Sequence, residues 1–193
     1  MYESKVGGIG FVAGRWPLDR DLLTIVFIHG SGGSSVLWHA QVEALADGMN
    51  TIALDLPGHG RSDGEGFSCV EDYAAAAEGF IDLSRTFSIS GKTDPSKVEP
   101  LVESMAACSP GVALGDFKAC DAFAVMERVA EIEVPVLVLT ASDDNLTPVK
   151  YGTFLADRLG NSFIVNIADA GHLSPMEKPE EVTRAILEFV LSL

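Results

Sequence analysis

The hydrophobic pattern of this chain is a series of short apolar runs that are separated by glycine, proline and charged residues. The run Thr24–His29 is apolar and β-branched, and the glycines Gly30, Gly32 and Gly33 follow it directly. A strand that is covered on both faces of a parallel sheet does not need to alternate between polar and apolar residues. We therefore expect a buried central strand here, and similar runs predict further strands at residues 50–57, 134–140 and 162–167.

Apolar residues at helical spacing predict helices between these strands. Trp38, Val42 and Leu45 follow Ser34 and Ser35, either of which is a suitable helix N-cap. Residues 6–16 are typical of an edge strand or a hairpin. Strands that alternate with helices predict an α/β fold, in which a mostly parallel, doubly wound sheet is covered by helices on both faces. The further predicted helices run from a capping box at 68–71 to residue 83, from 94–95 onward, over 122–130, over 147–160 and from 179 to the end.

The pattern predicts one domain with three successive parts. Residues 1–83 and 134–193 carry the alternating strands and helices of an α/β core. Residues 84–133 show no strand pattern and instead contain helical stripes, so we expect a partial helical cap inserted into the core. A chain of 193 residues is long enough to bury a sizeable hydrophobic core.

The net charge of the chain argues against some classes of binding partner. With 13 basic and 28 acidic residues the net charge is −15, which argues against binding to nucleic acid or to an anionic membrane. No apolar run approaches the roughly 20 residues that span a bilayer, and the first five residues are too polar for a signal peptide. We expect a cytoplasmic protein whose acidic surface promotes solubility.

The three cysteines, Cys69, Cys108 and Cys120, are odd in number, widely spaced and not accompanied by a nearby cluster of histidines. They predict neither a disulfide framework nor a zinc site. A small, buried and unreactive thiol is the simplest interpretation of each, and a catalytic cysteine is the alternative.

Polar sequence follows four of the predicted strands, at residues 29–33, 55–62, 142–148 and 170–174. In a parallel sheet the functional groups lie on loops at the carboxyl ends of strands. In the first loop the glycines allow the N–H groups of Ser31 and Gly32 to face a developing negative charge. The alternative for this loop is a plain turn between a strand and a helix.

Together these loops resemble those of the α/β-hydrolase fold family, of the esterase, meta-cleavage-product hydrolase and haloperoxidase-like kind. That family combines an HG-x-G oxyanion loop, a D-x-P-G-x-G-x-S loop, an acid in a D-x-x-T-P context, and a late G-H followed by an E-x-P-E-E helix start. All four motifs occur here in family order. The resemblance implies that a nucleophile, a histidine and an acid hydrolyse a small ester-like or activated carbonyl substrate without a metal or a cofactor.

By position, the resemblance implies that Asp144 is the acid and His172 is the general base, with Ser31 and Gly32 at the oxyanion site. The base takes the proton of the nucleophile, and the acid holds the imidazole in one tautomer. The alternative interpretations are a loop acid near a helix N-terminus and a turn histidine that is held by hydrogen bonds. Trp38 is either part of the core or a wall of the substrate pocket.

Three other polar residues of these loops are expected to have no catalytic role. Asp143 is interpreted as a solvated neighbour of the acid. His29 and His59 lie inside tight glycine loops and are interpreted as structural, although His29 is also placed to brace the oxyanion loop.

The sequence departs from the family at the nucleophile, because it contains no G-x-S-x-G elbow. The nearest approaches, around Ser68, Ser90 and Ser162, each lack a required glycine, and none follows a buried strand into a helix. An elbow with its strand, its helix and the next strand needs roughly 35 residues. The predicted helix that ends at residue 83 instead runs almost directly into cap-like sequence. We infer that the elbow segment is absent, and no nucleophile is identified.

The absence of this segment affects the predicted sheet, since the elbow strand of the family lies beside the strand at 24–29. Without it, backbone groups at the centre of the sheet lose their partners. We expect either that residues 24–29 pair directly with residues 134–140 in a narrowed sheet, or that a second copy completes the sheet as a homo-oligomer.

Two functions follow from these observations. The first is a hydrolase, carboxylesterase-like by family, that is impaired or inactive as given because its nucleophile is absent. The second is a non-catalytic protein that binds a small molecule on a truncated hydrolase scaffold. A fully formed pair of acid and base favours the first, and a well-ordered chain without a reactive serine favours the second.

Overall fold

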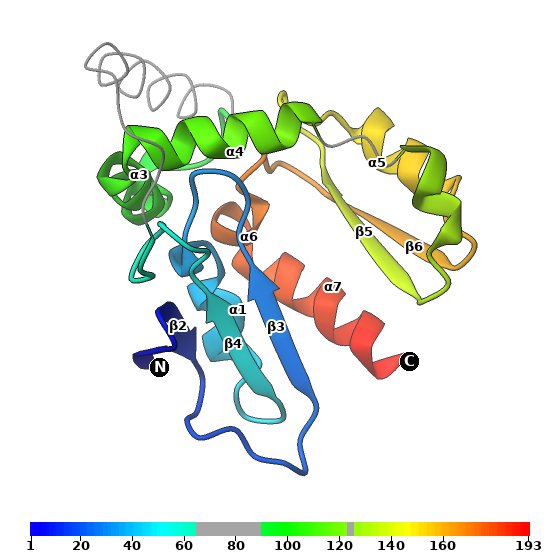
Figure 1. Cartoon of the computed structure of the whole chain (residues 1–193). Coiled ribbons are helices and arrows are strands. Elements are labelled where there is room, and N and C mark those ends of the chain that lie inside the picture. Colours follow the sequence, from blue (N-terminus) through cyan, green and yellow to red (C-terminus); the bar gives the residue numbers. More distant parts are fainter. Residues whose placement is uncertain (65–89, 123–125) are drawn as a thin grey trace. The chain divides into compact units, whose positions relative to one another are not determined.

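The structure is a computed structural model, and it describes residues 1–64, 90–122 and 126–193. These residues form two compact units. The first unit contains the described residues among 1–83 and 98–121, and the second contains those among 84–97 and 122–193. Figure 1 labels their helices and strands.

The described strands are β1 (Tyr2–Val6), β2 (Ile9–Ala13), β3 (Thr24–Ile28), β4 (Asn50–Leu54), β5 (Val136–Ala141) and β6 (Ser162–Ile167). The α-helices are α1 (His39–Ala44), α3 (Glu99–Ala107), α4 (Pro110–Ala122), α5 (Val149–Ala156), α6 (Ser174–Glu177) and α7 (Pro179–Leu191). Three short 3-10 segments are η1 (Ser35–Trp38), η2 (Pro95–Lys97) and η3 (Met126–Glu131). The predicted strands at 24–29, 50–57, 134–140 and 162–167 are thus confirmed as strands. The predicted burial of 24–29 is wrong for the described residues, because Thr24, Val26 and Ile28 of β3 are exposed.

The first unit is built on a four-stranded sheet of order β1-β2-β4-β3. β1 and β2 form a hairpin over residues 2–13, so the hairpin alternative is confirmed but begins before the predicted range of 6–16. β2 also pairs with β4 in the antiparallel direction. β3 and β4 are parallel, with Val26 opposite Ile52. The loops that follow β3 and β4 therefore both lie at the carboxyl ends of the strands, as expected for neighbouring parallel strands.

Helix α1 packs on this sheet through the predicted apolar stripe. Val42 and Leu45 are buried, and the helix contacts β2 and β4. Thr51 on β4 donates a hydrogen bond from Oγ1 to the carbonyl of Val42 at 2.8 Å, which fastens the helix to the strand. Of the two predicted caps, Ser34 occupies the N-cap position of η1, but its side chain makes no capping hydrogen bond and instead accepts one from Ser104 Oγ at 2.8 Å.

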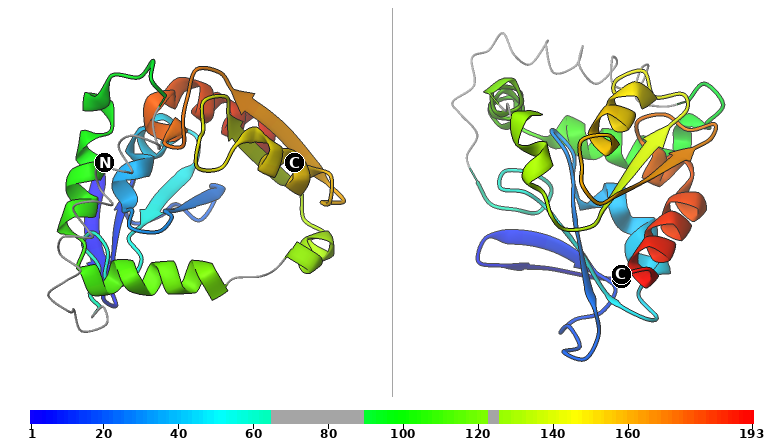
Figure 2. Two further views of the ribbon diagram at one scale, coloured as in Figure 1. Left: turned by 90° about the horizontal axis from the view of Figure 1, so that it is seen from above. Right: turned by 90° about the vertical axis from the view of Figure 1, so that its right-hand side faces the viewer.

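The second unit contains the parallel pair β5–β6 between two helices. Alternate residues of β5 face opposite sides, as the period of a strand requires. Thr140 lies against Gly152 of α5, whereas Ala141 packs with Val182 of α7 in a buried cluster. Figure 2 shows α5 and α7 on the two faces of this pair of strands.

One helix prediction differs from the structure. Of the residues predicted as a helix at 122–130, residue 122 ends α4 and residues 126–130 belong to the 3-10 segment η3, whereas the longer helix α4 at 110–122 was not predicted. Gly111 and Gly115 obscured α4 in the sequence, since glycine is a poor helix former and the apolar residues of this segment do not gather on one face of the helix. The predicted helix from the capping box to residue 83 lies outside the described residues.

The strand pairings can be compared with the two predicted ways of completing the sheet. The ladders of the described residues pair β3 with β4 in the first unit and β5 with β6 in the second. The direct pairing of residues 24–29 with 134–140, which would join the two units, stays a prediction. Completion of the sheet by a second copy stays a prediction.

The described cysteines are free thiols. Cys108 is half-buried and Cys120 is exposed, and both are free, whereas Cys69 lies outside the described residues. Burial raises the pKa of the Cys108 thiol, and a raised pKa is typical of an unreactive cysteine.

Within residues 1–64, 90–122 and 126–193, no helix has the length and apolar character needed to cross a bilayer.

Candidate active site

Asp144 is held by the turn that leads from β5 into α5. Its Oδ1 accepts hydrogen bonds from the backbone N–H groups of Leu146 at 2.9 Å and Thr147 at 2.8 Å. Its Oδ2 accepts a third from the Thr147 hydroxyl at 2.7 Å. An aspartate followed by backbone donors two and three residues later is a local turn motif, so the sequence around Asp144 fixes the carboxylate before any partner arrives.

His172 lies on the loop after β6, and the structure brings it to Asp144. Its Nδ1 is 3.0 Å from Asp144 Oδ2 and 3.2 Å from the Thr147 hydroxyl oxygen. A carboxylate only accepts, so Nδ1 carries a hydrogen, and in the neutral ring the lone pair is then on Nε2. The side chain of Asp144 is 8% exposed and that of His172 is 41% exposed. The arrangement thus combines a sheltered acid with an accessible base.

The pKa of Asp144 is lowered from its ordinary value. Burial of the carboxyl raises the pKa, but the hydrogen bonds from the backbone and hydroxyl of Thr147 and from His172 together lower it by more. The carboxylate is therefore charged at neutral pH, and it can hold the ring in one tautomer and stabilise an imidazolium.

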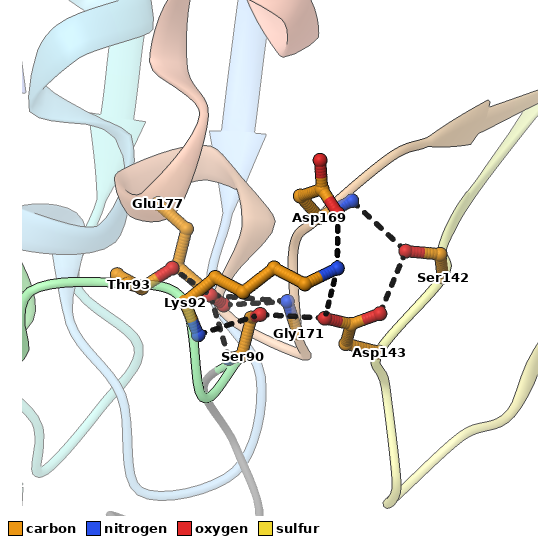
Figure 3. Close-up of polar contacts among 8 residues, drawn as sticks. All are labelled: Ser90, Lys92, Thr93, Ser142, Asp143, Asp169, Gly171 and Glu177. Carbon is orange, nitrogen blue, oxygen red and sulfur yellow. Dashed lines mark hydrogen bonds and ion pairs between the residues drawn. The ribbon is translucent and has the colours of Figure 1, made fainter.

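A buried carboxylate holds the loop that carries His172. The sequence did not point to this residue. Glu177 of α6 is 1% exposed, and its carboxylate accepts from the N–H of Gly171 at 3.0 Å, from Ser90 N–H at 2.8 Å and from the Thr93 hydroxyl at 2.7 Å. Figure 3 shows these donors converging on Glu177. Because Gly171 directly precedes His172, Glu177 fixes the backbone that carries the candidate base. The E-x-P-E-E motif contained this residue, but a glutamate at a helix start gave no signal of burial.

Asp143 is not the purely solvated neighbour that the sequence suggested. Its Oδ2 accepts from the Ser90 hydroxyl at 2.7 Å and its Oδ1 from the Ser142 hydroxyl at 2.9 Å. These hydrogen bonds, with that of Ser90 the largest cause, lower the pKa of Asp143. Lys92 lies between Asp143 and Asp169 and pairs with both (Figure 3). The sequence could not reveal this network, because its members are far apart along the chain.

The candidate oxyanion loop lies in the first unit. Gly32 has a φ of +68°, which glycine adopts without strain, and its N–H donates to Asp116 Oδ2 on α4 at 2.8 Å. Ser31 is exposed beside it. The expected donor at Gly32 is therefore engaged by a carboxylate of the chain itself, a contact that the sequence did not predict.

Trp38 and the loop histidines support the same region of the first unit. Trp38 stacks on Phe27 of β3 with ring centroids 5.2 Å apart and donates from Nε1 to the carbonyl of Ile28 at 3.2 Å. His29 donates from Nδ1 to the carbonyl of Gly30 at 2.7 Å and accepts at Nε2 from the N–H of Leu56 at 3.0 Å. Burial lowers the pKa of His29 and favours the neutral ring that these two bonds require. His29 is thus held by hydrogen bonds within its loops, as its structural interpretation expected. Its bracing of an oxyanion site and a pocket role for Trp38 stay predictions.

The two groups of candidate residues belong to different units. Asp144 and His172 are in the second unit, and Ser31, Gly32 and Trp38 are in the first. Ser90 binds Asp143, and Ser162 donates to the carbonyl of Ala156 at 3.0 Å, while Ser68 lies outside the described residues. In the described part of the chain, no three His, Cys, Asp or Glu side chains are placed to hold a metal ion.

Comparison with known proteins gives two family matches. Residues 24–88 match a family described as alpha/beta hydrolase fold, and residues 116–192 match one described as TAP-like protein. The chain is similar to BpoC from Mycobacterium tuberculosis, a non-heme bromoperoxidase by assigned name, with 45% identity over 62 residues. That match covers 32% of this chain and 24% of BpoC, so it spans about a quarter of the relative's length.

Two other matches extend over most of the chain. RutD from Rhizobium rhizogenes, a carbamate hydrolase by assigned name, is 26% identical over 249 residues, which covers 90% of this chain and 95% of RutD. The crystal structure of the enol-lactonase from Burkholderia xenovorans superposes with a TM-score of 0.82 at 16% identity, covering 98% of this chain and 100% of that chain. Other matched proteins are named as esterases and lactonases. At this identity the structural match establishes a shared fold.

Proposed function

This chain belongs to the α/β-hydrolase fold family, and on that premise we propose that it keeps the acid and base of a hydrolase of small ester-like or activated carbonyl substrates but lacks the nucleophile. The observation that carries the proposal is the 3.0 Å contact between His172 Nδ1 and Asp144 Oδ2. It orients the ring so that Nε2 is free of the acid and able to accept a proton.

The absence of a nucleophile is supported by sequence and by length. The chain contains no G-x-S-x-G, and the RutD match runs over 249 positions, more than the 193 residues available here. RutD thus carries residues that have no counterpart in this chain. Removing the nucleophile from a triad costs most of its catalytic advantage. We therefore propose that the chain is impaired or inactive as an esterase.

A fluorophosphonate probe tests this proposal, since it labels serines that a neighbouring base has activated. We expect intact-mass spectrometry to show the mass of the 193 residues without an adduct, and p-nitrophenyl acetate hydrolysis that is equal in the wild type and His172→Gln. A stoichiometric adduct that disappears in His172→Gln would instead identify a serine activated by His172. That result would contradict the impaired state and restore a complete esterase mechanism.

A second candidate function is non-catalytic binding of a small molecule. The observation that favours it is the bond between the Gly32 N–H and Asp116 at 2.8 Å, because the donor expected at the oxyanion site already holds a carboxylate. Equilibrium dialysis of a panel of small esters and their product acids separates the two candidates. Saturable binding without turnover supports this second function.

A further inference from the structure

Helix α4 covers the loops that follow β3 and β4 in the first unit (Figure 1). Val112 and Asp116 lie one helical turn apart and therefore share a face of α4. Val112 is buried, and a Cβ added at Gly58 would lie 2.6 Å from its Cγ2. The apolar contact between Val112 and Gly58 thus packs α4 against the loop that follows β4. Asp116, on the same face of the helix, then lies beside the loops that follow β3 and β4.

Asp116 joins the two loops through a single oxygen. Its Oδ2 accepts from the N–H of Gly32 at 2.8 Å and contacts His59 Nε2 at 3.0 Å. A carboxylate oxygen only accepts, so His59 donates through Nε2. Two N–H donors from separate loops therefore converge on one negatively charged atom.

Each of the two donors is also held by contacts that do not involve Asp116. The Gly32 N–H is presented by a backbone with φ of +68°. The His59 side chain is 2% exposed, its ring lies 5.0 Å from that of His29, and its Nδ1 is 3.2 Å from the carbonyl oxygen of Pro57. Donors that need no rearrangement bind an anion more strongly than mobile surface groups do. Asp116 itself is less enclosed, with a side chain that is 24% exposed.

We propose that the Gly32 N–H and His59 Nε2–H form a binding site for the carboxylate of a small molecule, and that Asp116 is its internal occupant. The side chain closes the site to external anions because a tethered carboxylate competes at a high effective concentration. When Asp116 is removed, a small carboxylate takes the same two hydrogen bonds. This inference goes beyond hydrolysis, since binding requires neither a nucleophile nor the pair of Asp144 and His172.

Acetate is the probe that tests the site. In ¹⁵N-labelled protein, we expect Asp116→Ala to show saturable shifts of the Gly32 amide and of the His59 ring nitrogens during an acetate titration. The wild type should bind acetate at least about tenfold more weakly, because acetate must displace the tethered carboxylate. Asp116→Asn, which keeps the size of the side chain but removes its charge, should fall between the two and replaces Asp116→Ala where that variant is unfolded.

Two controls separate a built site from a general effect of charge. Glu103→Ala removes an exposed acid from the neighbouring helix α3, and it should bind acetate as weakly as the wild type. Asp116→Ala combined with His59→Gln should lose the saturable shift at Gly32. The proposal is overturned if folded Asp116→Ala gives no saturable shift, if Glu103→Ala gains the same affinity, or if the double variant binds acetate unchanged.

Discussion

At the scale of single residues, Asp144 shows how local hydrogen bonds set the charge of the candidate acid. Its pKa in the folded chain lies below the ordinary value of 3.8, so its contribution to stability is complete above that value. The contribution is lost as the pH falls through the lower pKa of the folded state. The charged hydrogen bonds of this carboxylate therefore stabilise the fold at neutral pH and not in strong acid.

We predict that Asp144→Asn lowers the free energy of unfolding by about 1.5–3 kcal/mol at pH 7, the usual range for hydrogen bonds to a charged group. The difference from the wild type should shrink below about pH 4, where the wild-type carboxyl is also becoming neutral. Urea unfolding at a series of pH values measures both effects. Asp157→Asn, an exposed acid at the end of α5, serves as the control and should change stability little. A loss that is independent of pH would show that the charge of Asp144 is not its cause.

Glu177 makes several buried hydrogen bonds, although nothing in the sequence indicates that it is buried. Both carboxylate oxygens accept from the Gly171 N–H at 3.0 Å, and Oε2 also accepts from Ser90. A glutamine at this position would turn an NH₂ group toward buried N–H donors, which leaves at least one of them without an acceptor.

We predict that Glu177→Gln destabilises the chain by about 1–3 kcal/mol. The amide signals of Gly171 and His172 should also shift, because the backbone before His172 loses its anchor. Chemical unfolding and an amide spectrum measure the two effects. Glu180→Gln, three residues further along and exposed, is the matched control and should leave both unchanged. Equal behaviour of the two variants would contradict a supporting role for Glu177.

At the scale of elements, the sequence predicted those segments whose pattern is local. β3, β5, β6 and α7 are confirmed because apolar runs and a proline start are sufficient signals. α4 was not predicted, because its two glycines and evenly distributed apolar residues give no stripe. The contact of Asp144 with His172 was foreseen only through the family resemblance, whereas Asp116 on Gly32 and Ser90 on Asp143 join residues that no local pattern connects.

The packing of α5 on β5 depends on one glycine. A Cβ added at Gly152 would lie 2.2 Å from Cγ2 of Thr140 and 3.3 Å from Cγ1 of Val138, both on the strand. These strand atoms cannot move away easily, because the opposite face of β5 packs in the buried cluster that includes Val182. The helix would have to rise from the sheet to accept a methyl group.

We predict that Gly152→Ala destabilises the chain by about 1–3 kcal/mol, the usual effect of overpacking a core. Gly160→Ala is the control, since nothing lies within 4 Å of a Cβ added there. The control should leave the midpoint of thermal unfolding near that of the wild type. A Gly152→Ala variant that is as stable as the wild type would mean that α5 is not held against Thr140.

At the scale of the whole molecule, the first unit has an apolar strand at the end of its sheet. Among the described residues β3 pairs with β4 alone. Val26 and Ile28, which share one face of β3, are 50% and 57% exposed, whereas Phe27 on the other face is buried. An unpaired edge with exposed apolar residues promotes pairing with another chain. The sequence run that predicted a central strand therefore lies, in the described residues, at an edge.

We predict that the chain associates with itself as its concentration rises, and that β3 is part of the contact. Sedimentation velocity should show an average mass that increases above the 20.4 kDa of one chain. Val26→Lys should shift that mass toward one chain, because a charge on the strand opposes pairing at the edge. Leu191→Lys changes an even more exposed apolar residue, 73% exposed at the end of α7, and should leave association unchanged. A chain that stays at 20.4 kDa over the full concentration range, or two variants with equal effects, would exclude β3 as the contact and with it the completion of the sheet by a second copy.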